Sequence, residues 1–345
     1  MKSLYMVFSP FQMLNAIEAR HSLQSKNDEC HLVYCRAISD RNAEQIRAMI
    51  EETDWASVFY DDSPEERSLY RKRFSGVMGY ASKLGPFDRM VVGHFGWDLG
   101  RHVSHALQPR EVVVLDDGTA GHRIYNYRFS DVIPSGGQKR ASRVASLFSR
   151  YVKRIGWGMR TNPYRSVTFF SIYQHRIHAC DQVIPNRFDY LRSQVKGEVE
   201  PGLVAFLGGC QVELGILSAD YYRHALEVIR RHYPVGKLLY FPHRRESTEK
   251  LESLAKQLDF AVVQIDVPFE MHLIGSDILP EEIVTLYSTA IDSCGALLEG
   301  KDVRLTAFEL DPDRINGDEQ RHFIQSVYAY YRAHGRENTS VLPIA

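Results

Sequence analysis

The stretch Lys237-Leu-Leu-Tyr-Phe-Pro-His-Arg-Arg-Glu246 decides how the second half of the chain is interpreted. Its apolar beginning, Lys237–Phe241, is typical of a short buried strand, and Ser247–Leu258 after it is typical of a helix. A proline, a histidine, two arginines and a glutamate between them suit a core poorly. In open α/β sheets ligands bind at the carboxyl ends of the strands, so the stretch indicates a site for an anionic ligand. The alternative is a basic loop solvated at the surface.

Strands and helices are predicted to alternate along the whole chain. Compact apolar runs such as Leu4–Phe8 and Glu111–Leu115 predict buried strands. The amphipathic stretches between them predict helices, and the first helix has Ser9 as its N-cap and Pro10 in its first turn. Pro280 predicts the start of a later helix. Alternation of this kind predicts parallel sheets that are covered by helices on both faces.

The length of 345 residues predicts two domains, because a single ordinary core is smaller than this. A polar segment with two glycines and a proline, Lys196–Gly202, is interpreted as the linker. The first Rossmann-like domain is then 1–195 and the second is 200–320, and 321–345 contains a final amphipathic helix.

Composition excludes several classes of protein. The formal net charge is −1, which gives no reason to expect a nucleic-acid partner. The five cysteines are odd in number and form no CxxC pair, which indicates a reducing compartment and argues against a disulfide framework or a cysteine-rich zinc site. No apolar run is long enough for a signal peptide or a membrane span. We therefore expect a cytoplasmic protein.

The segment 139–165 stands out because it has eight basic residues and no acidic residue. Its apolar residues recur at i, i+3 and i+4 and predict an amphipathic helix on a cationic background. Such a helix can bind peripherally to the anionic inner face of the cytoplasmic membrane. It can equally be an ordinary helix that packs on the sheet.

Two acidic residues and a glycine, Asp116-Asp117-Gly118, follow the β-branched strand Glu111–Leu115. A helix N-cap or a turn would use the same residue types. A carboxylate at this edge of a sheet would also suit a general base. The residues alone leave both interpretations open.

Three further polar loops follow predicted strands in the second half. Gly208-Gly209 allows the backbone to approach a ligand closely, and Glu270 could bind the hydroxyls of a ribose. Ser288-Thr289 precede a helix, whose N-terminus favours phosphate. One half with an acid and one with a phosphate site favour an α/β nucleotide-sugar transferase of the GT-B type, with two Rossmann-like domains and a cleft between them.

Short motifs in a fixed order resemble those of bacterial sialyltransferases. The motifs are Ser-Pro-Phe-Gln-Met-Leu-Asn at 9–15, Asp-Asp-Gly at 116–118, Tyr-Phe-Pro-His-Arg-Arg-Glu at 240–246, Pro-Phe-Glu at 268–270 and Tyr-Ser-Thr-Ala at 287–290. The resemblance is to the lipooligosaccharide sialyltransferases of glycosyltransferase family 52 and to related capsule polysialyltransferases. It implies an inverting, metal-independent enzyme without a cofactor that transfers sialic acid, or a related nonulosonic acid, from a CMP-activated donor to a glycan hydroxyl.

The resemblance also implies a role for each motif. Asp117 is the expected general base, with Asp116 as its neighbour or cap, although either acid fits the motif. His243 is expected to stabilise or protonate the departing CMP phosphate. Because Pro242 precedes His243, where the family has proline after the histidine, the neighbouring arginines compete for that contact. The expected substrate-binding residues are Gly208, Gly209, Arg244, Arg245, Glu270, Ser288, Thr289, Gln12 and Gly118.

The same resemblance divides the substrates between the domains. Domain 1–195 is expected to bind an oligosaccharide or glycolipid acceptor of the bacterial surface, and domain 200–320 the CMP-sugar. The helix in 321–345 is expected to cross back to the first domain, as in many GT-B proteins. The alternatives are a GT-B enzyme for CMP-Kdo or for a UDP- or GDP-sugar, and a non-catalytic nucleotide- or glycan-binding relative.

Overall fold

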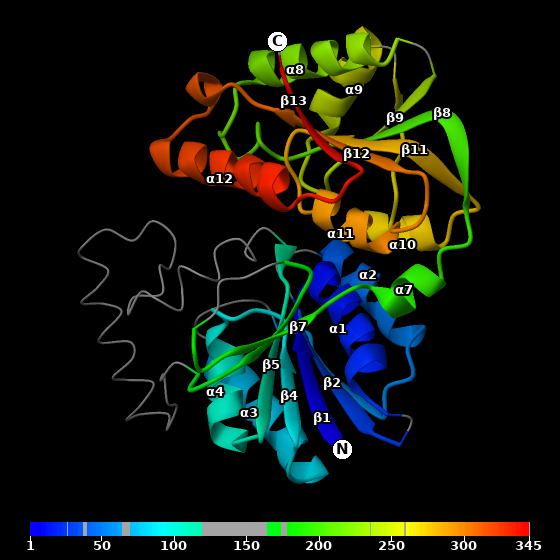
Figure 1. Ribbon diagram of the computed structural model, residues 1–345. Helices are drawn as coiled ribbons and strands as arrows, with labels where there is room; N and C mark the ends of the chain where they lie inside the picture. Colours follow the sequence, from blue (N-terminus) through cyan, green and yellow to red (C-terminus); the bar gives the residue numbers. More distant parts are fainter. Residues whose placement is uncertain are drawn as a thin grey trace. The chain divides into compact units, whose positions relative to one another are not determined.

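The computed structural model describes residues 1–25, 27–36, 40–63, 70–118, 164–173, 178–234, 236–258 and 260–344. The chain forms two compact units, Met1–Asn186 and Arg187–Ala345. Within the described residues each unit is a parallel sheet with helices between its strands, as the sequence predicts (Figure 1).

The first unit contains a sheet of seven described strands in the order β3-β2-β1-β4-β5-β6-β7. Its elements are β1 (Lys2–Val7), α1 (Pro10–Leu23), β2 (Glu29–Cys35), α2 (Asp40–Glu51), β3 (Ser57–Asp61), α3 (Tyr70–Leu84), β4 (Arg89–Val92), α4 (Asp98–Leu107), β5 (Glu111–Leu115), β6 (Thr168–Ser171) and β7 (Gln182–Pro185). Helices α1 and α2 cover one face and α3 and α4 the other (Figure 1). Leu4, Met6 and Val7 of β1 are fully buried because the strand has neighbours on both sides and helices on both faces.

The second unit contains a sheet of six described strands in the order β10-β9-β8-β11-β12-β13. Its elements are α7 (Asp189–Ser193), β8 (Glu198–Leu207), α8 (Ala219–His232), β9 (Lys237–Phe241), α9 (Thr248–Leu258), β10 (Ala261–Val262), α10 (Phe269–Ile274), β11 (Ile278–Thr285), α11 (Ala290–Leu297), β12 (Arg304–Glu309), α12 (Asp318–His334) and β13 (Thr339–Pro343). Helices α8 and α9 cover one face, and α10, α11 and α12 the other (Figure 1).

Both sheets reverse their strand order at one place. The reversal lies between β1 and β4 in the first unit and between β8 and β11 in the second. Ligands of open α/β sheets bind at the carboxyl ends of the strands beside such a reversal. These two edges are therefore the places to look for functional residues.

The boundary between the units lies earlier than the sequence predicts. Helix α7 was assigned to domain 1–195, but it belongs to the second unit and packs against α11. The predicted linker Lys196–Gly202 is largely strand: Glu198, Val199 and Glu200 pair with β11. The polar composition predicted a linker because this end of β8 is largely exposed. Gly202 is glycine because its φ of 77° is left-handed.

The final helix packs within the second unit, and the prediction that 321–345 crosses back to the first domain stays a prediction. Helix α12 belongs to the second unit and buries Ile324, Val327 and Tyr328 there. The hydroxyl of Tyr328 donates to the carbonyl of Leu286 at 2.8 Å. After the helix, β13 adds a sixth strand beside β12, which the sequence analysis missed.

Pro280 lies in a strand and does not start a helix. It belongs to β11, and the register between β11 and β8 shifts between Pro280 and Glu282. Proline has no N–H for the ladder, so it is tolerated in a strand where pairing is irregular. The cationic segment 139–165 lies outside the described residues except for its last two positions, and the interpretations of it remain predictions.

Candidate functional site

The two adjacent acids at the end of β5 have different environments. Asp116 is 1% exposed, and both of its oxygens accept hydrogen bonds from β6 and the residue after it. The Ser171 hydroxyl donates to Oδ1 at 2.6 Å and the Ile172 N–H to Oδ2 at 2.8 Å. Asp116 therefore ties β5 to β6, while the Asp117 side chain is 23% exposed at the carboxyl edge of the sheet.

Asp117 lies beside residues from the ends of β1 and β4. The hydroxyl of Ser9 donates to Asp117 Oδ1 at 3.4 Å, and His94 Nε2 lies 3.9 Å from Oδ2. His94 Nδ1 accepts the N–H of Gly96 at 2.9 Å, so the neutral ring carries its proton on Nε2, toward the carboxylate. Burial lowers the pKa of His94, and the nearby Asp117 opposes that shift. We call Ser9, His94 and Asp117 the carboxylate site.

Gln12 and Gly118 have mainly structural contacts. Gln12 is fully buried and its Oε1 accepts the N–H of Phe8 at 3.0 Å, which fixes the start of α1. A Cβ at Gly93 would lie 2.1 Å from that oxygen, so glycine directly after β4 leaves room for the Gln12 side chain. Gly118 has a left-handed φ of 57°, consistent with a turn after the two acids. Both residues lie in the same unit as Asp117, as the sequence predicts.

The opening stretch of sequence forms a tight turn directly after β9. The N–H of Glu246 donates to the carbonyl of His243 at 2.9 Å, which closes a turn whose two central residues are Arg244 and Arg245. Both arginines are exposed. The Glu246 carboxylate returns to accept the N–H of His243 at 2.6 Å. We call His243–Glu246 the arginine turn.

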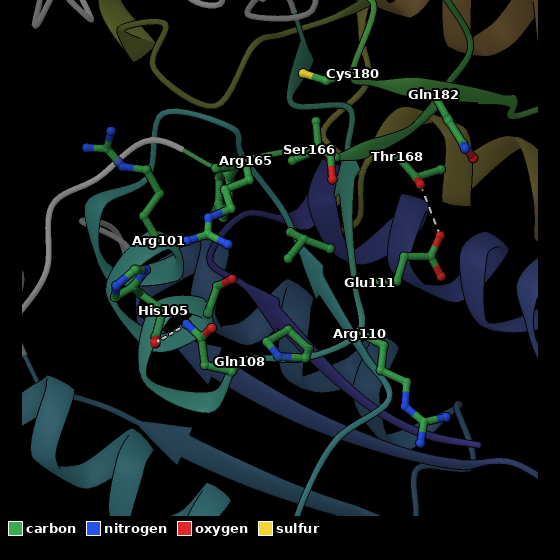
Figure 2. Close-up of a pocket in the computed structure, with 15 residues that line it drawn as sticks. Arg101, His105, Gln108, Arg110, Glu111, Arg165, Ser166, Thr168, Cys180 and Gln182 are labelled. Atoms are coloured by element: carbon green, nitrogen blue, oxygen red, sulfur yellow. Dashed lines mark hydrogen bonds between the residues drawn. The ribbon is translucent and has the colours of Figure 1, made fainter.

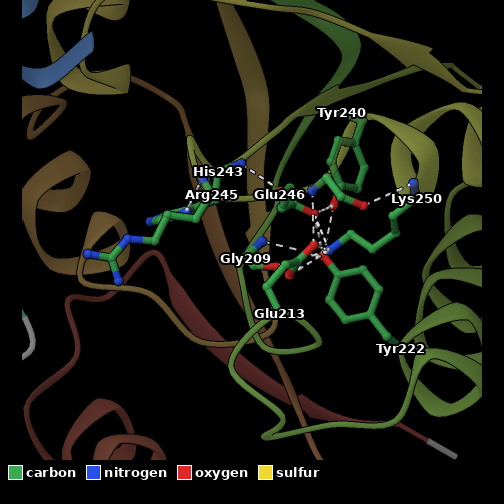
Figure 3. A network of polar contacts seen from close by, with 9 residues as sticks. Gly209, Glu213, Tyr222, Tyr240, His243, Arg245, Glu246 and Lys250 are labelled. Atoms are coloured by element: carbon green, nitrogen blue, oxygen red, sulfur yellow. Dashed lines mark hydrogen bonds and ion pairs between the residues drawn. The ribbon is translucent and has the colours of Figure 1, made fainter. Parts of the chain in front are cut away.

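A buried polar network supports the arginine turn from behind (Figure 3). The side chain of Glu246 is 0% exposed, and its Oε1 accepts the Tyr240 hydroxyl at 2.5 Å. Lys250 Nζ lies 2.8 Å from Glu246 Oε1 and 2.9 Å from Glu213 Oε1, and it stands over the ring of Tyr222 at 4.5 Å from the centroid. We call Glu213, Tyr222, Tyr240, Glu246 and Lys250 the lysine cluster.

Gly208 and Gly209 connect the end of β8 to the same network. A Cβ at Gly208 would lie 2.2 Å from Glu246 Oε2 and 2.6 Å from the Tyr240 hydroxyl. The N–H of Gly209 donates to the Tyr222 hydroxyl at 3.3 Å. The structure therefore brings the predicted Gly-Gly loop and the predicted His-Arg-Arg loop together at adjacent strand ends.

His243 is neutral near pH 7. Burial, together with the charges of Arg244 and Arg245, lowers its pKa to about 4. Its Nδ1 faces the N–H of Arg245 at 3.2 Å, which places the proton of the neutral ring on Nε2. The free protein thus has a hydrogen-bond donor at this position and no imidazolium charge.

Glu270 and the start of α11 form a second group in this unit. Glu270 is 7% exposed, burial raises its pKa, and its Oε1 accepts the hydroxyl of Ser293 at 2.5 Å. The Ser293 hydroxyl also lies 3.2 Å from the carbonyl of Thr289. Ser288 Oγ accepts the N–H of Ala290 at 3.2 Å. Glu270 is thereby linked to the residues that precede α11.

The sequence analysis missed Ser9, Glu246 and Lys250 as site residues, and the position of His94 after a predicted strand indicated only that it could line the acceptor side. A signal existed for Ser9 and His94, since each follows a strand at the reversal of the first sheet. The only local signal for Lys250 was Glu246 four residues before it, since its other partners Glu213 and Gly209 are distant in sequence.

A cavity of about 580 Å³ lies at the opposite, amino edge of the first sheet (Figure 2). Its lining includes the first residues of β5, β6 and β7, which are Glu111, Thr168 and Gln182. Arg101 and Arg165 also line it. Of the described lining residues, none is a predicted site residue. The cavity is therefore separate from the carboxylate site.

No family model and no curated protein matches the chain. Among solved structures, the chain is similar to the UDP-GlcNAc 2-epimerase of Neisseria meningitidis bound to UDP-GlcNAc, with a TM-score of 0.53, 10% identity, and 97% of this chain and 92% of that chain covered. It is similar to the spinosyn forosaminyltransferase SpnP with a TM-score of 0.53, 12% identity, and 100% and 86% covered. It matches the GT-B domain of a Photobacterium damselae sialyltransferase with a TM-score of 0.49, 10% identity and 99% of both chains covered.

These similarities define the fold. The two parallel sheets with alternating helices are those of a GT-B protein, and the predicted fold class is confirmed. In the described part of the chain, no helix is long and apolar enough to cross a membrane.

Proposed function

We propose that the protein is a glycosyltransferase that uses a nucleotide sugar, and that its donor is CMP-activated sialic acid or a related nonulosonic acid. The observation that carries the proposal is the arginine turn at the end of β9, next to Gly208 and Gly209 at the end of β8. Two guanidinium groups, an imidazole N–H and an exposed backbone loop are suited to a phosphate. The GT-B fold supports a nucleotide-sugar substrate in general.

In this proposal Asp117 is the general base. Its carboxylate takes the proton of the acceptor hydroxyl as the acceptor oxygen bonds to the anomeric carbon of the donor sugar. The Ser9 hydroxyl and the His94 Nε2–H orient the carboxylate and favour its charged form. Asp116 has a positioning role, because its oxygens already accept bonds from Ser171 and Ile172.

The arginine turn stabilises the leaving group. As the bond between the anomeric carbon and the phosphate oxygen breaks, the electron pair stays with CMP and its phosphate gains charge. Arg244, Arg245 and the N–H of the neutral His243 ring are donors fixed where that charge develops. Ser288 and Thr289 are proposed to add donors to the phosphate, and Glu270 to bind the ribose. We propose that no metal or cofactor is needed, because CMP carries a single phosphate.

The test is release of CMP from CMP-sialic acid in the presence of mixed oligosaccharide acceptors. Release by the wild-type protein that is lost in Asp117→Ala and in His243→Ala supports the proposal. Full turnover in both variants refutes the assignment of the site. If the protein binds CMP but releases none from CMP-sialic acid, it is instead a non-catalytic relative.

A UDP-sugar is the second candidate donor. It is favoured by the similarity to the Neisseria meningitidis epimerase, whose bound ligand is UDP-GlcNAc. A thermal-shift comparison of CMP, UDP and GDP separates the candidates. A rise in melting temperature with CMP alone supports the CMP-sugar, and a response to UDP alone excludes it.

We propose further that the first unit binds an oligosaccharide or glycolipid acceptor and that the protein works in the cytoplasm, at the inner face of the membrane. The cationic segment 139–165 would provide the contact with anionic lipid. Sedimentation with phosphatidylglycerol vesicles at low and high salt tests this. Neutralising Lys153 and Arg154 should reduce binding, and equal binding of the variant would contradict the proposal.

A further inference from the structure

We propose that Lys250 is a positioning residue of the arginine turn, which holds the loops after β8 and β9 together and offsets the charge of the acids behind them. The identity of the ligand rests on the proposed function. The placement of Lys250 does not depend on it, because every contact lies within the second unit.

Lys250 joins the arginine turn and the start of α9, which follow one another in sequence, to the distant loop after β8. It lies in the first turn of α9, and its ammonium group contacts Glu246 at the end of the arginine turn. It also contacts Glu213 in the loop after β8 and donates to the carbonyl of Gly209 at 3.4 Å. A single side chain therefore fixes the relative position of the Gly-Gly loop and the arginine turn (Figure 3).

The position of Lys250 is unfavourable for a cation, except that two carboxylates lie next to it. A cation in the first turn of a helix is opposed by the helix dipole, and the Lys250 side chain is only 12% exposed. The two carboxylates compensate for this cost. Burial raises the pKa of Glu246 and Lys250 opposes that shift, while at Glu213 the Lys250 and backbone hydrogen bonds outweigh burial and lower the pKa.

Charge balance links the lysine cluster to the ligand. Glu213 and Glu246 lie within the network behind Arg244 and Arg245, and on their own they would cancel the positive charge of the two arginines. With Lys250 present, the three cations exceed the two carboxylates by one unit of charge. The turn then keeps a positive field for an anionic ligand.

Lys250 also reaches His243 through Glu246. The Glu246 carboxylate pairs with the Lys250 ammonium group through Oε1. Its Oε2 accepts a hydrogen bond from the backbone N–H of His243 at 2.6 Å. Losing Lys250 would leave a buried carboxylate with less compensation, which favours its protonation or its exposure. Either change would loosen the turn that carries His243.

The test compares Lys250→Met with Glu246→Gln, the double variant Lys250→Met/Glu246→Gln and Lys250→Arg. Lys256→Met is the matched control, since Lys256 is exposed on the same helix. The first readout needs no ligand: NMR titration of the His243 ring. In Lys250→Met the pKa of His243 should rise, because the Lys250 charge adds to the lowering caused by burial and by Arg244 and Arg245. Lys250→Arg and the control should keep the wild-type titration.

The second readout is CMP affinity by calorimetry. We expect about a tenfold loss in Lys250→Met and a smaller loss in the double variant, because removing Glu246's charge restores the balance and glutamine still accepts the His243 N–H. If Lys250→Met fails to fold, folding and CMP binding by the double variant give the same support. A folded Lys250→Met with unchanged titration and affinity, or a double variant as weak as the sum of the singles, would overturn the proposal. If the wild-type protein binds no CMP, the proposed function fails, and the titration still decides the role of Lys250.

Discussion

In each unit a buried acid at the carboxyl edge of the sheet lies next to more exposed charged residues, but the two acids have different partners. In the first, Asp116 is held by a hydroxyl and a backbone N–H from β6 and its end, and the presented group is the next residue, Asp117. In the second, Glu246 accepts a hydroxyl, the His243 N–H and the ammonium of Lys250. The first edge presents a carboxylate and the second presents arginines.

The difference teaches how each edge obtains its charge. Two neutral donors, the Ser9 hydroxyl and the His94 ring, lie beside the Asp117 carboxylate. The arginine turn lies over a buried carboxylate, so it needs Lys250 to keep its positive charge. In the proposed function, the carboxylate removes a proton in the first unit and the arginines stabilise an anion in the second.

The largest expected effect is the loss of the presented acid. Asp117→Asn should reduce transfer by about 10²–10⁴-fold, because it removes the general base and keeps the shape of the side chain. The thermal melting temperature should stay close to that of the wild-type protein. Initial rates of CMP release with a saturating acceptor measure the effect, and a variant with full activity would contradict the assignment.

Asp116→Asn should affect folding stability, whereas Asp117→Asn should affect activity. The amide replaces one buried acceptor with a donor facing Ser171 or the Ile172 N–H, which should cost about 1–3 kcal/mol of folding stability. Chemical denaturation followed by circular dichroism measures this. A stable variant that loses transfer as fully as Asp117→Asn would show that Asp116 is the base.

His243→Gln should lower CMP affinity about tenfold near pH 6 and remove part of its pH dependence. The free ring has a pKa of about 4, and a bound phosphate should raise it. Binding then takes up a proton between those two values, so the wild-type protein gains affinity as the pH falls from about 7 toward 4.

Because CMP itself titrates in that range, the informative quantity is the difference between wild-type and His243→Gln affinities at each pH. Calorimetry at several pH values supplies it. A difference that stays constant from pH 4 to 7 would place His243 away from the phosphate.

The smallest expected effect concerns Glu270. Burial raises its pKa in the folded state, so its contribution to stability is fully present below the unfolded value of about 4.5 and is lost as the pH rises through the raised folded value. Glu270→Gln should keep the Ser293 hydrogen bond and equal or exceed the wild-type melting temperature at pH 8. A lower melting temperature at pH 8 would contradict this, and weaker CMP binding would support a contact with the ribose.

The sequence predicted the sheets because buried parallel strands are continuous apolar runs, as at Leu4–Phe8. It misplaced features whose local composition conflicts with their tertiary role. Pro280 resembles a helix start but lies at a register shift, and Lys196–Gly202 resembles a linker but largely pairs with β11. Local pattern cannot distinguish these cases, because the partner strand is more than 70 residues away in the sequence.

The candidate site was predictable to the extent that it follows strand ends. That rule places Asp117 and His243 at strand ends, and their roles stay predictions. Which of Asp116 and Asp117 is the more exposed acid is a matter of burial, which the sequence does not show. The lysine cluster was not predictable, because the contact between Lys250 and the distant Glu213 forms only in the folded chain. A lysine in a predicted helix is otherwise read as a solvated side chain.

The most direct test of the central claim is a structure of the protein with CMP bound. We predict that the phosphate lies within hydrogen-bond distance of His243 Nε2 or of an Arg244 or Arg245 guanidinium, at the loop that contains Gly208. CMP bound elsewhere in the second unit, or a phosphate that contacts none of these groups, would contradict the account.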